Sequence, residues 1–343
     1  MVILVSATGS RPLNAELRDS LQLRAMRAAP PGQAMKGERR KVFCSALEQS
    51  EQLLNAASQT PADVRPMLVF YGIAQGVRAL FACAPSISDR DFRTKGHGLR
   101  ERNLRGSLRS MSVEATGTGM FAALCHLCDF TEFQAPVTFE QLWAVNPHLF
   151  QRRLAGSDQP PAVTAGCILD HSINSEMAVM TLMFLGSDVG DRLPTRVDVA
   201  DYVRSNYGPY PFEVLPLEER SNFLFKYPRE TWVDLAVSVP LEQHESAVAH
   251  LEARQSRIGY NTWILPRIGG VLPKPNALVL WWALFFSLSI RARYEPEGWT
   301  KDLDVDSSPV AVQLQDVLDD APSRCHALLL EAIQEVCSLA GEP

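Results

Sequence analysis

The chain has 343 residues, of which 46% are hydrophobic and 21% charged, and its formal net charge is −6 at pH 7. A chain of this length buries roughly three-quarters of its unfolded surface, in one large domain or two modest ones. The composition excludes disordered, collagen-like and coiled-coil proteins. The negative charge argues against a protein coated in nucleic acid, but it is compatible with a local basic face.

Residues 1–40 are the part of the chain least committed to the fold, and we interpret them as a weakly ordered or accessory segment. Helical spacing of apolar residues begins near Val42 and continues to residue 57. A second helix is predicted over 66–84, with Pro66 in its first turn. Between residues 85 and 110 the apolar residues follow neither helical nor strand spacing, which predicts a long polar loop or a broken helix.

The middle of the chain changes from helical to strand-like patterning. A buried helix is predicted over 119–130, and the capping-box residues 138–141 open another. Apolar and polar residues alternate over 233–239, which is typical of a half-buried strand. Further strands are predicted over 163–169 and 176–185. Helical spacing then returns in four segments, over 241–255, 276–293, 309–319 and 323–339.

These elements predict an α+β fold that is predominantly α-helical. The N- and C-terminal helices should share one core, with a small central β-sheet subdomain within residues 160–240. We expect 41–343 to form a single large unit, in which the parts are helical (41–135), mixed with the small sheet (136–255) and helical (256–343).

Cysteine usage and the longest apolar run predict a cytoplasmic protein without a membrane partner. The seven cysteines are an odd number spread along the chain, unlike a secreted disulfide framework. The longest apolar stretch, 277–290, is shorter than a membrane span and predicts a buried core helix instead.

The strongest electrostatic feature is the basic segment 90–109, which has a net charge of +5. Its cations are Arg90, Arg93, Lys95, Arg100, Arg102, Arg105 and Arg109. Arginine forks suit phosphate oxygens, and Gly96 and Gly98 would let the backbone approach a ligand beside His97. The structural alternative is a solvated loop whose arginines pair with carboxylates, such as the acidic run that begins at Asp302.

Arg90 and His97 raise a second hypothesis, because their spacing satisfies the Arg-x(4–6)-His pattern of HEPN ribonucleases. A histidine near neutral pKa can move the proton of an RNA 2′-hydroxyl while an arginine stabilises the charge on phosphorus. Gly96 and Gly98 disfavour the helix on which this pattern should lie. A loop histidine bonded to backbone is the alternative role for His97.

Metal binding has one candidate in Cys125 and Cys128, which have ligand spacing and could combine with Cys167 and His171. The pairs are far apart in sequence, and residues 120–130 are apolar, so small core cysteines fit better. We expect neither a metal site nor a cofactor.

Three segments together resemble the YaaC-like family of bacterial proteins. They are Pro66–Gly72, Gly96–Leu99 and the end of the long apolar helix from Leu288 into Arg293–Trp299. The resemblance would extend over about residues 40–340. It implies a bacterial, cytoplasmic protein of unassigned activity and directs attention to His97 and to the Arg293–Trp299 corner. We expect that corner to end the helix, with Arg293 bonded to its carbonyls.

Two functional classes therefore fit the sequence, and they leave open whether the protein is an enzyme. The first is a binding or regulatory protein that contacts nucleic acid or a nucleotide through 90–109. The second is a metal-independent ribonuclease that uses Arg90 and His97. A protein partner, a second copy of the chain, or a larger assembly such as a phage-defence system remains compatible with both.

Overall fold

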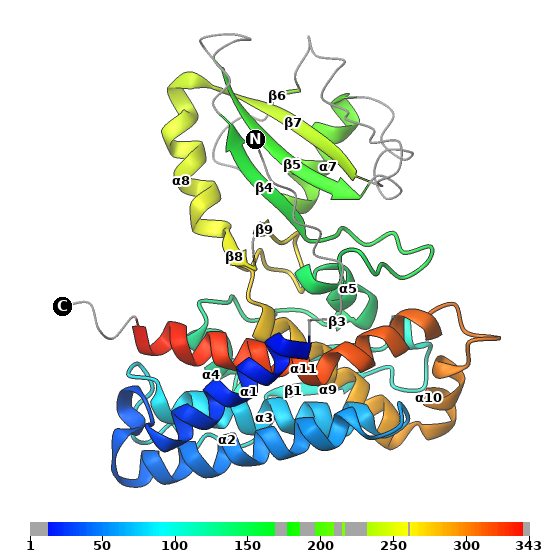
Figure 1. Cartoon of the computed structure of the whole chain (residues 1–343). Coiled ribbons are helices and arrows are strands. Elements are labelled where there is room, and N and C mark those ends of the chain that lie inside the picture. The colour runs from blue at the N-terminus through cyan, green and yellow to red at the C-terminus, as the bar shows by residue number, and fades with distance from the viewer. Residues whose placement is uncertain are drawn as a thin grey trace. The chain divides into compact units, whose positions relative to one another are not determined.

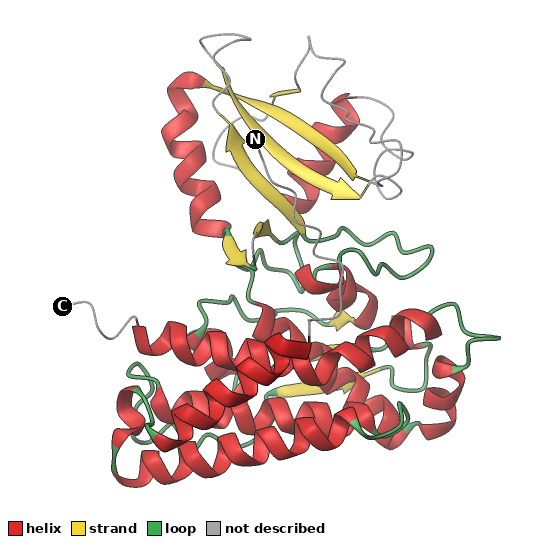
Figure 2. Ribbon diagram, in the orientation of Figure 1, coloured by secondary structure: helices red, strands yellow, loops and turns green. Residues whose placement is uncertain are grey.

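The computed structural model describes residues 13–168, 177–185, 196–208, 215–216, 232–259 and 261–338. The chain forms two compact units (Figures 1 and 2). The first combines Met1–Asp129, Pro136–Leu142 and Leu278–Pro343, and the second combines Phe130–Ala135 with Trp143–Ala277. The predominantly helical α+β class predicted from the sequence is confirmed.

The first unit is a helical assembly with one small sheet. Its helices are α1 (Leu13–Ala28), α2 (Gly37–Ser58), α3 (Arg65–Cys83), α4 (Gly119–Leu127), α9 (Ala277–Tyr294), α10 (Pro296–Leu303) and α11 (Ala311–Ser338), with short 3-10 turns η1 (Gly32–Met35) and η2 (Leu108–Ser110). The antiparallel sheet joins β1 (Leu99–Arg102), β2 (Ser112–Ala115) and β3 (Val137–Thr138) in that order. Helix α5 (Phe139–Ala144) follows β3 directly.

N- and C-terminal helices share one core in this unit, as predicted, because α3 packs against both α2 and α11. Two glycines of α3 make the close packing possible. A Cβ on Gly72 would lie 2.8 Å from Leu54 of α2, and a Cβ on Gly76 would lie 2.5 Å from Cδ2 of Leu329 in α11. Helix α3 also has the length and hydropathy of a membrane span, yet most of it is buried inside the protein.

Helix α9 is a buried, apolar element of the core. Trp281, Trp282 and Phe285 are fully buried, and the rings of Trp281 and Phe285 stack at 5.3 Å. This confirms the prediction of a buried core helix over 276–293. The capping box is also present, since Gln141 N donates to Thr138 Oγ1 at 3.2 Å and Thr138 N donates to Gln141 Oε1 at 3.0 Å.

Near the two ends of the chain, the structure merges two predicted helices into one and adds two helices that the sequence patterns did not predict. The two helices predicted over 309–319 and 323–339 are one helix, α11, with Pro322 inside it. Pro322 provides no N–H for the preceding turn, but Leu318 and Cys325 are fully buried on either side of it, so packing holds the helix together. Pro296 follows α9 and also begins a further helix, α10. At the other end of the chain, residues 13–28 form helix α1.

The second unit contains an antiparallel sheet with strand order β6-β7-β5-β4-β9-β8. Its strands are β4 (Val163–Ile168), β5 (Met177–Leu185), β6 (Leu215–Pro216), β7 (Trp232–Pro240), β8 (Ser256–Ile258) and β9 (Asn261–Ile264). In this register Met180 of β5 pairs with Cys167 and with Val237. The helices are α7 (Arg196–Tyr207) and α8 (His244–Arg254), with 3-10 turns η3 (Pro147–Leu149) and η4 (Leu241–Gln243). The three strands predicted from the sequence are thus confirmed.

Candidate anion-binding site

The site begins with a polar stripe on α3. Tyr71, Gln75 and Arg78 follow one another at intervals of four and three residues, which places them on one face of the helix. Arg78 Nη1 donates to Gln75 Oε1 at 2.8 Å, and the phenol of Tyr71 is partly exposed. The stripe therefore presents a guanidinium and a hydroxyl on an otherwise apolar helix.

A glycine-flanked loop carries His97. Gly96 and Gly98 have φ angles of 82° and 81°, which favour glycine over other residues. The carbonyls of Gly96 and His97 accept hydrogen bonds from the first turn of α4, from Met120 N at 2.9 Å and Phe121 N at 3.1 Å. Gly98 is close to α4 rather than to an open ligand site, since a Cβ there would lie 2.8 Å from Phe121 N. The glycines thus fix the backbone of His97.

Aromatic rings surround the imidazole of His97. The rings of Phe70, Phe286 and Tyr71 lie with centroids 5.1, 6.0 and 6.2 Å from it. Nδ1 of His97 is buried and has no hydrogen-bond partner among the residues that the structure describes. The imidazole is therefore half-buried among aromatic rings, with its buried Nδ1 unpaired within the described parts of the chain.

Arg293, in the last turn of α9, completes the arrangement. Its Nη1 donates to Tyr71 Oη at 2.8 Å, and its guanidinium lies 4.6 Å from the ring centroid of Tyr294. Burial, and then the charges of Arg293 and Arg78, lower the pKa of His97 from its ordinary value. We call these five residues, Tyr71, Gln75, Arg78, His97 and Arg293, the His97 cluster.

Most cations of segment 90–109 are neutralised within the first unit. The ion pairs are Arg93–Glu38 at 2.8 Å, Arg100–Glu114 at 3.7 Å, Arg102–Glu114 at 2.8 Å, Arg105–Glu295 at 3.5 Å and Arg109–Glu140 at 3.3 Å. Pairing with Arg102 lowers the pKa of Glu114. Arg90 and Lys95 are exposed and have no carboxylate partner within the described parts of the chain.

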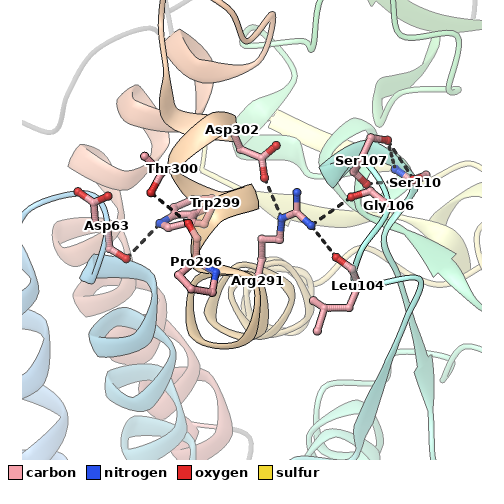
Figure 3. A network of polar contacts seen from close by, with 10 residues as sticks. All are labelled: Asp63, Leu104, Gly106, Ser107, Ser110, Arg291, Pro296, Trp299, Thr300 and Asp302. Carbon is pink, nitrogen blue, oxygen red and sulfur yellow. Dashed lines mark hydrogen bonds and ion pairs between the residues drawn. The ribbon is translucent and has the colours of Figure 1, made fainter.

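The acidic residue expected to pair with this segment binds a different arginine. Arg291 of α9 contacts Asp302 of α10 at 2.9 Å, and its Nη1 donates to the carbonyls of Leu104 at 2.6 Å and Gly106 at 3.1 Å (Figure 3). Arg293, predicted to bond the carbonyls at the end of its own helix, donates instead to Tyr71 Oη, and the carbonyls that Arg291 bonds belong to the loop after β1. This network fixes the loop after β1 to the end of α9.

The end of α9 is held from its other side by Trp299. This buried residue of α10 donates from Nε1 to the carbonyl of Asp63 at 3.1 Å (Figure 3). The predicted packing of the Arg293–Trp299 corner against the helix end is thus present. It holds α9, and hence Arg293, in a defined position relative to α3.

An open pocket of about 630 Å³ lies beside the loop after β1. Its lining residues are Glu101, Asn103, Leu104, Arg105, Ile290, Tyr294 and Glu295. Two carboxylates face one guanidinium, and Arg105 is already paired with Glu295. Charge therefore disfavours an anion in this pocket and favours the His97 cluster.

The structure brings His97 together with Arg293, the two features to which the family resemblance points. It places Arg90 in an exposed turn, and no described contact joins its side chain to His97. Neither residue lies on a helix. Arg78 and Tyr71 were not predicted as site residues, although their helical spacing relative to Gln75 was readable from the sequence.

Cys125 is buried in α4, and Cys128 ends that helix, half-buried. Among the described residues no group of three or more His, Cys, Asp or Glu side chains could hold a metal ion. His171 lies outside the described residues, as does the side chain of Cys167.

These features define a mainly helical α+β protein whose first unit carries a cationic, partly aromatic cluster. The chain matches the family described as YaaC-like protein over residues 12–333, nearly its whole length. It therefore belongs to the YaaC-like family, as the resemblance indicated. Comparisons with curated proteins and with solved structures give no significant match.

Proposed function

We propose that this YaaC-like protein is a cytoplasmic binding or regulatory protein that contacts a phosphate-rich partner, nucleic acid or nucleotide, through the His97 cluster and segment 90–109. The observation that carries the proposal is the convergence of Arg78, Arg293 and His97 with no carboxylate bonded to them among the described residues. Two guanidinium groups near one imidazole repel each other, and an anion bound among them would relieve that repulsion.

The components of the cluster suit a phosphate group. Guanidinium forks bind phosphate oxygens through charge-assisted hydrogen bonds. The Tyr71 hydroxyl and the Tyr294 ring offer a further donor and a stacking surface. A nucleotide ligand could thus use both charge and stacking.

The basic segment would extend the same surface toward a longer polyanion. Lys95 is two residues from His97 and, like Arg90, is exposed without a carboxylate partner among the described residues. The paired arginines, such as Arg102 with Glu114, should contribute less, because their charge is already compensated. The unpaired cations are therefore the main expected contacts outside the cluster.

The test measures binding of a fluorescent single-stranded RNA of about 20 nucleotides, with ATP as competitor. Reversal of both cluster arginines, Arg78→Glu with Arg293→Glu, should weaken binding at least about tenfold, because two phosphate contacts are lost. The matched control is Arg18→Glu with Lys36→Glu, which makes the same charge change at exposed positions of the helical unit.

Equal losses in the two variants would mean that net charge and not the cluster determines binding. Binding of RNA that competes with ATP would identify a nucleotide pocket, whereas RNA binding without competition would identify a nucleic-acid surface. Failure of the parent protein to bind either probe at low salt would overturn the proposal.

A second candidate is RNA cleavage with His97 as general base. It is favoured by the lowered pKa of His97, since a neutral imidazole can accept the proton of a 2′-hydroxyl, and by the guanidinium groups beside it. Arg90 would have to approach His97 in the presence of RNA. His97→Ala should then keep RNA affinity and reduce cleavage at least about a hundredfold. If the parent leaves bound RNA intact, the protein is not such a ribonuclease.

A further inference from the structure

Two cysteines from distant parts of the sequence lie together at the end of the helical unit. Cys83 is the last residue of α3 and is buried, and Cys337 is in the last turn of α11 and is half-buried. A Cβ built on Gly32 of η1 would lie 2.5 Å from the carbonyl oxygen of Cys83 and 3.2 Å from Cys337 Sγ. Both cysteines therefore border the same backbone position.

The ionisation of each thiol influences that of the other. Cys83 Sγ lies 3.2 Å from the carbonyl of Leu80, which accepts a hydrogen bond from it. Interaction with Cys83 lowers the pKa of Cys337, whereas interaction with Cys337, and then burial, raises the pKa of Cys83. Cys337 is thus the thiol of the pair that ionises first, and it is also the more exposed one.

We propose that Cys83 and Cys337 are a redox-active pair that forms a disulfide when the protein meets a hydroperoxide. The bond would join the end of α3, the helix that carries Tyr71 and Arg78, to the end of α11. The chemistry needs one attacking thiolate and one resolving thiol within reach of each other, and the proposal assigns these roles to Cys337 and Cys83, which both border Gly32.

The reaction balances with hydrogen peroxide as the oxidant. The Cys337 thiolate attacks one peroxide oxygen, the O–O bond breaks, and the other oxygen leaves as hydroxide and becomes water. The sulfenic acid formed on Cys337 is attacked by Cys83, which loses its proton, and a second water leaves as the S–S bond forms. Two thiols give up two electrons, and one peroxide becomes two waters.

Cys325 and Cys44 are poorer candidates for such a pair. Burial raises the pKa of Cys325 well above its ordinary value, so its thiol stays protonated. Cys44 directs its thiol to the carbonyl of Arg27 at 3.5 Å. Cys337 lies at a helix C-terminus, where the carbonyl dipoles oppose a negative charge. We therefore expect oxidation over minutes to hours, toward the slow end of the ordinary range.

The experiment treats the full-length, fully reduced protein with hydrogen peroxide and counts free thiols after unfolding. The chain has seven cysteines, and we expect the count to fall by two. Cleavage after Lys, Arg and Glu, which does not occur before proline, places Cys337 in a peptide of residues 336–343, separate from Cys325. Mass spectrometry of the parent protein should find this peptide linked to the one that contains Cys83.

Two variants complete the test. Cys337→Ser, a change at a half-buried site, should prevent the loss of two thiols, whereas the control Cys44→Ser should still lose two. The proposal fails if peroxide leaves all thiols free, if the linked peptides join other cysteines, or if Cys337 is recovered as sulfinic acid without a link. Dithiothreitol should restore the full thiol count of the oxidised parent.

Discussion

Arg291 and Asp302 form a buried ion pair across the turn between α9 and α10, with Nε and Oδ2 at 2.9 Å. Their side chains are only 6% and 15% exposed. Burial raises the pKa of Asp302 although Arg291 acts in the opposite direction. Because Arg291 also bonds the carbonyls of Leu104 and Gly106, one side chain connects three segments of the first unit.

Replacement Arg291→Ala should lower the free energy of unfolding by about 3–5 kcal/mol, because it leaves Asp302 buried without a cation. Urea denaturation followed by circular dichroism measures the change. The control is Arg293→Ala, two residues further along α9, which removes an exposed guanidinium and should cost less than about 1 kcal/mol. Similar losses in the two variants would contradict a special role for the buried pair.

Gly298 of α10 leaves space for this guanidinium. A Cβ at that position would lie 2.6 Å from Nη2 and 2.8 Å from Cζ of Arg291. We expect Gly298→Ala to destabilise the protein by about 1–3 kcal/mol, as overpacking does. In the Arg291→Ala background the same change should instead stabilise by up to about 1 kcal/mol, because alanine is the better helix former. Denaturation of all four proteins gives the coupling, and additive effects would refute the steric argument.

Gly76 of α3 predicts a second steric coupling, this time with Leu329 of α11. Gly76→Ala should cost about 1–3 kcal/mol despite the gain in helix propensity, because the new methyl group would occupy the space of the leucine side chain. Leu329→Ala alone creates a cavity and should cost about 2–5 kcal/mol. The double variant should be more stable than the sum of the single effects predicts. Thermal unfolding of the set tests this.

The pKa of His97 predicts how ligand binding depends on pH. A bound phosphate favours the imidazolium form, so proton uptake should accompany binding, and RNA affinity should rise between pH 8 and pH 6. RNA phosphodiesters do not titrate in that range, which makes RNA a suitable probe. His97→Gln should reduce the pH dependence of RNA affinity. The affinity that remains should come from Arg78 and Arg293, which stay charged throughout this pH range. An unchanged pH profile in this variant would remove His97 from the binding surface.

The same residue should affect stability in the absence of ligand. The pKa of His97 in the folded protein lies below its ordinary value of 6.5, so the unfolded chain takes up a proton more readily. The stability associated with the neutral imidazole is fully present above pH 6.5 and is lost as the pH falls through the lowered pKa. Chemical denaturation between pH 8 and pH 5 should show a smaller loss for His97→Gln than for the parent.

Short sequence patterns predicted those helices and strands whose formation depends mainly on residues close together in the chain. The capping box at Thr138 and Gln141, the apolar run of α9 and the alternating residues of β7 each carry a pattern within a few residues. Strand β1, with the sequence Leu-Arg-Glu-Arg, shows no readable alternation of apolar and polar residues, because Leu99 is its one apolar and its one buried residue. Its place is set by pairing with β2.

Short sequence patterns do not reveal features that depend on tertiary packing, as helix α11 and the His97 cluster illustrate. Pro322 is a strong helix breaker in isolation, and only the buried residues around it explain why the helix continues. Tyr71 and Arg293 are 222 positions apart, so their hydrogen bond depends on how α3 and α9 pack. The sequence identified His97 and the Arg293 corner separately, and their contact required the folded unit.

The first unit is discontinuous along the chain, and this has a consequence for synthesis on the ribosome. Helix α3 is complete at Cys83, but α9 and α11, which share its core, follow only after Leu278. At about 5–20 residues per second, the roughly 190 intervening residues take about 10–40 s to translate. During that time α3, which has the length and hydropathy of a membrane span, lacks its later partners. We expect the nascent chain to depend on a chaperone that binds apolar helices during this interval.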